Sequence, residues 1–401
     1  MPTHASEYEH VVPESSIESQ VERLHMFMTP FYPLFGRSET RQHAQMYVEG
    51  RLRRLERRTL EPIANENGVP RRPLQMFVGA GRWDDRPVIE LLRHNLVHDL
   101  GTRDGVLTLD GSGVQKWGRK SVGVKRQYCG RLGKVENCQI GEYLGYASAK
   151  GHTLVDFRLY LPEEWASDRG RRAAAHVPKD VKFAKGWELG YAMVKEHGPH
   201  IPHAWILGDD AYGRVPELRK RLDSDGERYL LDVPADTRVQ LIADGPFETV
   251  AAVADAIPKN QWHTVRIRDG EKGPIDVRAT KLRVTTRIGK GKKQEMRRET
   301  LLLIRRPSVG ESSFHLSNAK GFSVAKMAKV AGCRNYIEQS FELAKGEAGL
   351  AEYEVRSWVG WHHHMALSLT ALLFVVLERN RLKKNTGNHG SAGSLGHFAA
   401  A

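Results

Sequence analysis

Two apolar segments that each end in an aspartate constrain the fold of this chain most. Val106–Leu109 leads into Asp110, and "AWILGDD" repeats the plan and leads into Asp209. Short apolar runs of this kind predict buried strands. An unpaired carboxylate at the edge of a core is unfavourable, so both acids need a partner. The spacing of strands and helices allows the two acids to lie at neighbouring strand ends of one sheet.

A third acid, Glu338, lies in the helical segment "RNYIEQSFELAK". Arg334, Glu338 and Lys345 lie near one face of that helix, at steps of four and seven residues. Carboxylates that share a small volume repel each other unless cations bind them, and oxygen ligands favour Mg²⁺, or Mn²⁺ in its place. Two such ions can activate the attacking oxygen and stabilise the leaving oxygen in a phosphodiester displacement. A helix cap or an arginine partner is the simpler interpretation of any one acid, but the three together favour a metal site.

The chain as a whole reads as an α/β fold built from several parts. Residues 101–235 alternate between strand-like and helix-like segments and predict a mixed sheet covered by helices. Residues 316–384 hold the glutamate helix and an apolar helix whose longest apolar run is too short to span a membrane. The tail, 385–401, is low in complexity and is predicted to be disordered.

The net charge points to a polyanionic partner. The 401 residues carry 61 Lys and Arg against 48 Asp and Glu, a formal charge of +13, which favours nucleic acid. The segment 257–308 alone has 15 basic and 5 acidic residues and alternates like strands. It predicts a small antiparallel sheet within a basic insertion, 236–315, that clamps DNA through Lys290, Lys292 and Lys293; a solvated surface is the alternative.

The first part of the chain, 1–100, is predicted to be helical and to bind DNA. Around Ala64–Gln75 two apolar-periodic segments flank Gly68, which is the rhythm of a helix-turn-helix. Arg71 and Arg72 favour DNA binding over an ordinary helical hairpin. The N-terminus lacks an apolar signal segment, and the three cysteines have no metal-binding spacing, so we expect a reduced, intracellular protein.

Three long motifs carry a family resemblance: "LDGSGVQKWGRKSVGVKRQYCGRLGKVENCQIGEYLGYAS", "GDDAYGRVPELR" and "YIEQSFELAKGEAGLAEYEVRSWVGWHHHMAL". The chain resembles DDE-type transposases of insertion sequences, close to the IS seven-zero-one group and related to the transposases with the Y-R-E-K signature. The resemblance implies a ribonuclease-H-like catalytic core with a β-rich insertion before the last catalytic helix. It places the catalytic, metal-binding acids on Asp110, Asp209 and Glu338, and the signature's arginine and lysine on Arg334 and Lys345.

The chain departs from the family pattern in two places. Gly111 stands where family members often have a second acid, which leaves Asp110 as the acid of the first motif. The signature's tyrosine falls on Ala331, so its phosphate contact is absent or is supplied by Tyr336. In the second motif Asp209 is chosen over Asp210 because it follows the glycine, as in the family.

Other residues suit contacts with DNA. Lys116, Lys120, Lys125 and Arg126 follow the first acid and suit phosphate binding, although surface solubility explains them equally well. Trp262 lies in the basic insertion, where related transposases stack an aromatic on a flipped base; packing inside the small sheet is the alternative. The run His362–His364 is interpreted as a helix start beside DNA, because consecutive helix residues point in different directions and do not form a metal site.

These features together predict a DNA transposase. It would bind the terminal inverted repeats of an insertion sequence, cut them by metal-dependent hydrolysis, and join the freed 3′-hydroxyl to target DNA. We expect double-stranded DNA as partner, a homodimer in the synaptic complex, no membrane, and a bacterial cytoplasmic location at the nucleoid. The alternatives are a catalytically idle DNA-binding regulator, which would not need all three acids, and a nuclease without strand transfer, which would not need the basic insertion.

Overall fold

The computed structural model describes residues 20–270, 273–289 and 294–385, so Lys290, Lys292 and Lys293 and the tail from 386 lie outside the described residues. The strands are β1 (Val106–Gln115), β2 (Lys125–Cys129), β3 (Lys134–Ser148), β4 (Gly151–Leu159), β5 (Trp205–Gly208), β6 (Tyr229–Val233), β7 (Arg238–Val239), β8 (Glu248–Thr249), β9 (His263–Gly270), β10 (Gly273–Ile288), β11 (Glu295–Arg306) and β12 (Glu311–Ser317). The α-helices are α2 (Gln20–Met28), α3 (Ser38–Leu52), α4 (Leu60–Glu66), α5 (Arg71–Ala80), α6 (Asp85–Leu100), α7 (Glu163–Ser167), α8 (Arg169–Ala174), α9 (Gly186–His197), α10 (Asp210–Gly213), α11 (Pro216–Ser224), α12 (Val250–Ala256), α13 (Val324–Gly332), α14 (Asn335–Gly346) and α15 (Trp358–Asn385). Short 3₁₀ turns are η1 (Thr29–Phe35), η2 (Gly130–Leu132), η3 (Gly198–His200) and η4 (Lys259–Gln261).

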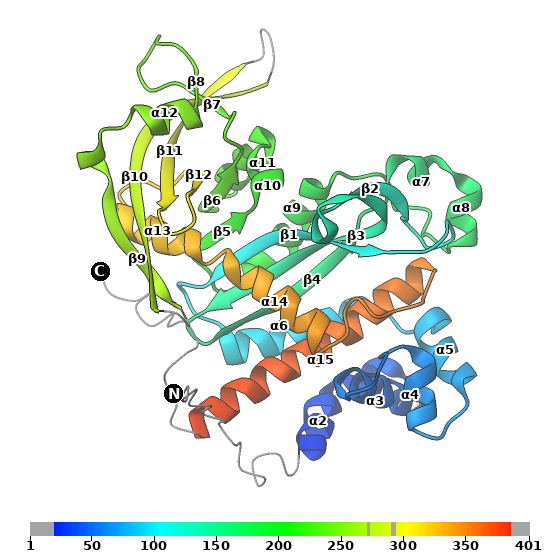
Figure 1. Ribbon diagram of the computed structural model, residues 1–401. Helices are drawn as coiled ribbons and strands as arrows, with labels where there is room; N and C mark the ends of the chain where they lie inside the picture. Colours follow the sequence, from blue (N-terminus) through cyan, green and yellow to red (C-terminus); the bar gives the residue numbers. More distant parts are fainter. Residues whose placement is uncertain (1–19, 271–272, 290–293, 386–401) are drawn as a thin grey trace, which may run out of the picture.

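One ten-stranded sheet, in the order β2-β3-β1-β5-β6-β12-β11-β10-β9 with β4 paired to β3, runs through the molecule (Figure 1). Within it, β1, β3 and β4 are antiparallel neighbours, and β5 and β6 add to β1 in parallel. Three antiparallel strands followed by two parallel ones, with helices on both faces, form a ribonuclease-H-like core. The predicted fold class is therefore confirmed.

The strands of the basic insertion continue the central sheet. β12 pairs antiparallel with β6, and β11, β10 and β9 follow it outward. The antiparallel strands were predicted correctly, but the separate small sheet was wrong. The reason lies in β11, where Leu301, Leu302 and Leu303 are all fully buried. A strand that is buried on both faces needs apolar cover on each side, and here α13 covers one face while α12 and Trp262 cover the other.

The N-terminal helices share their hydrophobic core with the sheet. α3, α5 and α6 all contact α15, and one continuous core joins their apolar side chains to those of β1, β3 and β4. Figure 1 shows α15 lying between α3 and α5 on one side and the sheet on the other, while α6 packs on β4 beside it. The region 1–100 is therefore helical as predicted, from residue 20 onward, but its described part has no hydrophobic core of its own.

The helix α15 is the core helix that the apolar run predicts. Trp358–Lys383 is long and apolar enough to cross a membrane by length and composition, and 89% of its apolar window is buried inside the protein. The helix-turn-helix rhythm also corresponds to two helices, α4 and α5, joined by a turn in which Gly68 has a φ of 63°. Such a left-handed backbone conformation favours glycine.

Candidate active site

Three aspartates form a row across β1, β5 and β6. β1 pairs with β5 at Leu109↔Gly208, and β5 pairs with β6 at Gly208↔Leu231. The residues that follow these partners are Asp110, Asp209 and Asp232. Because the three strands are parallel and in register, the three acids start from adjacent positions at one edge of the paired region.

The sequence context had indicated that β1 ends at Asp110, but the strand continues beyond it. β1 continues to Gln115, paired with β3 throughout. The pairing with β5, however, stops at Leu109, so Asp110 lies where β1 loses its neighbour on that side. Its cross-strand partner Tyr143 packs edge-on against Phe341 of α14, which places Asp110 on the face of the sheet that α14 covers.

Arg334 and Glu338 reach the aspartates from the start of α14. The Arg334 guanidinium donates to Glu338 Oε1 at 2.8 Å, forms an ion pair with Asp232 Oδ2 at 3.1 Å, and lies 4.0 Å from Asp110 Oδ2. Arg334 is therefore a common cation for acids from β1, β6 and α14. Of the predicted residues on this helix, Arg334 lies beside Asp110, and Glu338 is linked to Asp110 through Arg334.

Asp232 was missed from the sequence. Its other carboxylate oxygen bonds to His315 Nδ1 at 2.6 Å, so it is shared between His315 and Arg334. A signal was present: "RYLLDV" is a third apolar strand with an acid near its end, the same plan as the two segments that were recognised.

The acids of this site differ in their pKa values. Burial raises the pKa of Asp110 to about 7, with the neighbouring charge of Asp209 adding to it and Arg334 opposing it. Burial also raises the pKa of Asp209, against the opposing effect of Arg334. Burial would raise the pKa of Asp232 as well, but His315 and Arg334 outweigh it and lower that pKa. Asp110 and Asp209 therefore carry negative charge that the protein does not fully compensate.

Asp209 and Asp210 point to different environments. Asp209 accepts a hydrogen bond from the Ala211 amide at 3.0 Å and faces the charge of Asp110. Asp210 forms an ion pair with Arg214 at 2.7 Å, one turn along the chain, where both side chains are exposed. The geometry favours Asp209 as the member of the acidic row.

A buried acid on β3 also explains why a glycine, and not a second acid, stands at position 111. Gly111 is paired with Glu142 of β3, and a Cβ at Gly111 would lie 3.2 Å from Glu142 Oε2. Glu142 is buried and accepts a hydrogen bond from the Tyr212 hydroxyl at 2.5 Å. Its pKa is raised by burial, and the nearby Asp209 adds to the shift. A second acid at position 111 would meet this carboxylate directly.

The donor set at the acidic row fits a divalent cation. It is made of carboxylate oxygens, which hard cations such as Mg²⁺ prefer, and a cation would offset the burial and the charge of Asp209 that raise the pKa of Asp110. Among the described residues, the three-residue group whose ligand atoms all lie within 4.8 Å of one another is a different one, Asp156, Glu196 and His197. Asp110, Asp209 and Glu338 are less closely gathered, and Arg334 lies among them.

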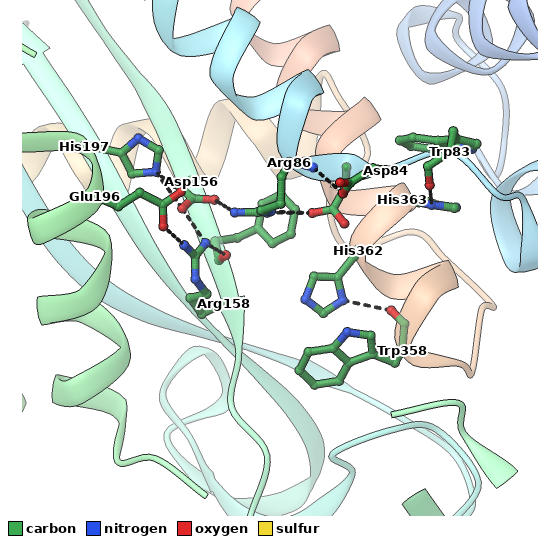
Figure 2. Close-up of polar contacts among 12 residues, drawn as sticks. Trp83, Asp84, Arg86, Asp156, Arg158, Glu196, His197, Trp358, His362 and His363 are labelled. Carbon is green, nitrogen blue, oxygen red and sulfur yellow. Dashed lines mark hydrogen bonds and ion pairs between the residues drawn. The ribbon is translucent and has the colours of Figure 1, made fainter. Parts of the chain in front are cut away.

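The group around Asp156 is already compensated by protein cations (Figure 2). Asp156 is fully buried on β4 and contacts Arg158, Arg86 at 3.0 Å and His197 at 2.8 Å. Glu196 is held by Arg158 at 2.5 Å. Although the ligand atoms have metal-binding spacing, two guanidinium groups occupy the same carboxylates, so we interpret the cluster as an ion-pair network that joins α6, β4 and α9.

The basic residues after the first acid lie in different environments. Lys120 is exposed, and the side chain of Arg126 is 72% exposed. Lys125 forms an ion pair with Glu164 at 2.9 Å. Lys116 is turned inward: its ammonium donates to the Tyr353 carbonyl at 2.9 Å and lies 3.3 Å from the centre of the Tyr353 ring. Burial lowers the pKa of Lys116 to about 7, which does not suit a residue that binds phosphate at the surface.

The predicted stacking role of Trp262 is wrong. Its side chain is 6% exposed and packs in the core beside β11, with the Arg305 guanidinium 4.3 Å from its ring centre. Tyr336, the candidate substitute for the signature tyrosine, is also buried, with its ring 5.2 Å from that of His152. Neither ring can reach DNA without opening the core around it.

The three consecutive histidines do not face DNA. His362, His363 and His364 are all buried in the first turns of α15. His363 stacks on Trp83 with ring centres 3.6 Å apart, and His364 bonds to the Tyr47 hydroxyl at 2.8 Å. They join α15 to the N-terminal helices, and Figure 2 shows His363 beside Trp83.

The remaining predicted DNA contacts lie at the surface or on the glutamate helix. Arg71 and Arg72 are exposed at the start of α5, where Arg71 forms an ion pair with Glu61 of α4 at 2.9 Å. Lys345 lies two turns beyond Glu338 on α14, with its ammonium 5.1 Å from the Phe341 ring centre.

Comparison with known proteins identifies the family of the chain. The profile of the DDE superfamily endonuclease family matches residues 30–274, which include Asp110 and Asp209. The chain belongs to this family. The chain is also 35% identical, over 192 residues, to a probable transposase for insertion sequence element IS701 from Microchaete diplosiphon. That alignment covers 47% of each chain, so the chain spans about half the length of the curated relative it matches.

Among solved structures, the NurA nuclease from Sulfolobus solfataricus aligns with 75% of this chain and 90% of its own. The two are 9% identical, with a TM-score of 0.24. A likeness this weak carries no weight for fold or function, and the family assignment depends on the profile match.

Proposed function

We propose that this DDE endonuclease is the transposase of an insertion sequence. It binds the ends of the element, cuts them by metal-dependent phosphodiester hydrolysis and joins the freed 3′-hydroxyl to target DNA. The observation that carries the proposal is the registered pair Asp110 and Asp209, with Glu338 reached through Arg334. Asp110 and Asp209 keep uncompensated charge in a protein of the endonuclease family.

Asp110, Asp209 and Glu338 would hold two divalent ions, Mg²⁺ or Mn²⁺. Such ions activate an attacking oxygen and stabilise the leaving oxygen when bound. Arg334 orients the Asp110 and Glu338 carboxylates, and the contact with Asp232 holds Arg334 in place. Lys345 lies roughly 10 Å along the helix from Glu338, a position suited to a phosphate of the bound strand.

DNA binding would extend beyond the acids. Arg71 and Arg72 lie at the N-terminus of α5, the second helix of the α4–α5 pair, and such positions suit contacts with phosphates and bases. Lys120 and Arg126 provide exposed charge near the first acid. The insertion, with Lys290, Lys292 and Lys293, is proposed to clamp the DNA end, and two copies of the chain would bring two element ends together.

Single-residue variants test the chemistry. Asp110→Ala, Asp209→Ala and Glu338→Ala should each lower cleavage of DNA carrying the element ends by roughly a thousandfold or more, while binding to the same DNA is kept. Asp210→Ala is the matched control, because Asp210 is adjacent but pairs with Arg214. If Asp209→Ala cut DNA like the unmodified protein while Asp210→Ala were inactive, the assignment of the second acid would fail.

The products and the metal requirement separate a transposase from a nuclease. Incubation with end DNA and a supercoiled target should yield joined products when Mg²⁺ is present, and chelation with EDTA should abolish both cleavage and joining. Cleavage without joined products would identify a nuclease. Binding without either reaction, in Mg²⁺ and in Mn²⁺, would identify a DNA-binding regulator.

A further inference from the structure

Trp117 is the most exposed large apolar side chain in the described part of the protein, with 88% of its surface accessible. It lies in the loop Lys116–Val124, between β1 and β2. The other seven tryptophans are buried or half-buried. Because an indole offers a large apolar surface, its full exposure on an ordered loop is unfavourable unless a partner covers it.

The loop holds Trp117 outward in a fixed position. The Asn137 side chain donates to the carbonyls of Lys116, at 2.6 Å, and Gly118, at 2.9 Å. The Lys116 amide donates to the Asn137 carbonyl at 2.9 Å. Gly118 has a φ of 82°, which favours glycine in this turn. The buried ammonium of Lys116 anchors the same loop on Tyr353, so its inward direction has a structural purpose.

Basic residues lie near Trp117 along the chain and on the neighbouring strand β2. Arg119 and Lys120 are exposed and follow Trp117 within three residues. Arg126 is paired across the sheet with Asn137, the residue that holds the loop, and its side chain is 72% exposed. An exposed aromatic ring among exposed cations complements a nucleic acid, whose bases stack and whose phosphates are negative.

The loop also joins the two regions that the proposed function assigns to DNA. The Val122 amide donates to the Arg356 carbonyl, and Lys116 contacts Tyr353, so the loop lies on the segment between α14 and α15. The same segment contacts the connection between α3 and α4 in the N-terminal region, where Arg58 forms an ion pair with Glu352 at 2.6 Å. In the other direction, β1 leads from the loop to Asp110, about 23 Å away along an extended strand.

We propose that Trp117 is a stacking platform for an unpaired nucleotide of the bound DNA, with Arg119, Lys120 and Arg126 contacting its phosphates. Stacking on an indole tolerates any base, because every base has a π face. The proposal deepens the proposed function, since it takes DNA as the ligand, but it concerns binding and its test does not depend on cleavage.

The test compares single-stranded and duplex DNA. The full chain, in EDTA, is titrated into fluorescein-labelled dT20 or a 20-base-pair duplex, and binding is followed by anisotropy. Trp117→Ala should weaken binding to dT20 about tenfold and binding to the duplex by less than about twofold, and Trp117→Phe should keep most of the affinity. Phe183→Ala, which removes another exposed aromatic side chain, 37% accessible and between α8 and α9, is the control and should bind both DNAs normally.

A second readout reports the indole itself. Binding of unlabelled dT20 should quench tryptophan emission, and Trp117→Phe should lose most of that quenching. Unchanged dT20 affinity in Trp117→Ala, or an equal loss for dT20 and duplex, would overturn the proposal. So would a Trp117-dependent self-association without DNA in sedimentation velocity, because a second copy would then cover the ring.

The two proposals can fail separately. Asp110→Ala should bind dT20 and show quenching like the unmodified protein. Quenching by dT20 in a protein that never cleaves DNA would keep the stacking platform and remove the transposase. Normal cleavage with no effect of Trp117→Ala on dT20 binding would do the opposite.

Discussion

Asp110 and Asp156 lie on β1 and β4 of the same sheet, but their pKa values are shifted in opposite directions. Asp156 is fully buried, and burial alone would raise its pKa; Arg158, His197 and Arg86 outweigh that effect and lower it. The Asp110 side chain is 17% exposed, yet its pKa is raised to about 7. The degree of burial therefore does not decide which carboxylate is perturbed upward.

The number of cations around each carboxylate decides it. Asp156 has two guanidinium groups and an imidazole in contact, whereas Asp110 shares the single guanidinium of Arg334 with Asp232 and Glu338. A structural acid is balanced inside the protein, while the acidic row is left with excess negative charge. A cation from solution can supply the missing charge there, and nowhere in the Asp156 cluster is there a comparable need.

The largest expected effect is on stability at Asp156. Asp156→Asn leaves Arg86 and Arg158 without their buried anion, so the free energy of unfolding should fall by about 3–5 kcal/mol. Asp110→Asn removes repulsion and should not lower it. Urea denaturation without metal, at pH 8, measures both variants. Equal destabilisation by the two substitutions would remove the distinction between the clusters.

The next effect is the pH dependence of metal binding. The folded-state pKa of Asp110, about 7, lies above its ordinary value of 3.8. The protonated form of Asp110 is thus favoured in the folded protein. The metal-free fold therefore loses stability as the pH rises from the ordinary pKa of 3.8 to the folded-state pKa of about 7. Mg²⁺ must displace that proton. Addition of Mg²⁺ should therefore raise the melting temperature more at pH 8 than at pH 6, by roughly 1–3 °C.

The Mg²⁺ effect on the melting temperature is checked by two controls. NaCl of matched ionic strength should give the same small shift at both pH values. Asp110→Asn should lose most of the pH-dependent part of the Mg²⁺ effect. An Mg²⁺ shift that is identical at pH 6 and pH 8 would contradict the assignment of uncompensated charge to Asp110.

The smallest effect is expected at Asp232. Asp232→Asn removes one of the anions that share the Arg334 guanidinium. The guanidinium should then interact more strongly with Asp110 and Glu338 and compete with cations for them. The Mg²⁺ concentration for half-maximal cleavage should rise about three- to tenfold, with a smaller change in the rate at saturating Mg²⁺. Asp210→Asn serves as control. A loss of rate that excess Mg²⁺ cannot restore would show that Asp232 acts in another way.

The elements that were predicted correctly are those with strong local patterns. The strands at 106 and 205 and the helix with Glu338 follow from apolar periodicity, and the register of parallel strands then brings their acids together. The role of Asp232 was missed although it follows the apolar residues of "YLL" in the same way as Asp110 and Asp209 follow theirs. The contact between Arg334 and Asp232 depends on β12 and His315, which lie far away in the sequence.

Other misjudgements have the same origin in tertiary contacts. Trp262 lies in a basic stretch and the histidines of α15 are themselves polar, which led to the interpretation that they lie beside DNA. Their actual neighbours come from distant segments: Arg305 and β11 for Trp262, and Trp83 and Tyr47 for the histidines. Lys116 shows the same effect, because its partner Tyr353 is absent from the local sequence.

The position of α15 has a consequence for synthesis. The helices α3, α5 and α6 and the strand β4 all pack on a helix that is translated after every other described element. Until that helix emerges from the ribosome, their apolar faces have no permanent cover, and the nascent chain should depend on chaperones or remain partly unfolded. The proposed DNA binding and cleavage would then become available together, late in translation, and a message cut short before α15 would yield neither.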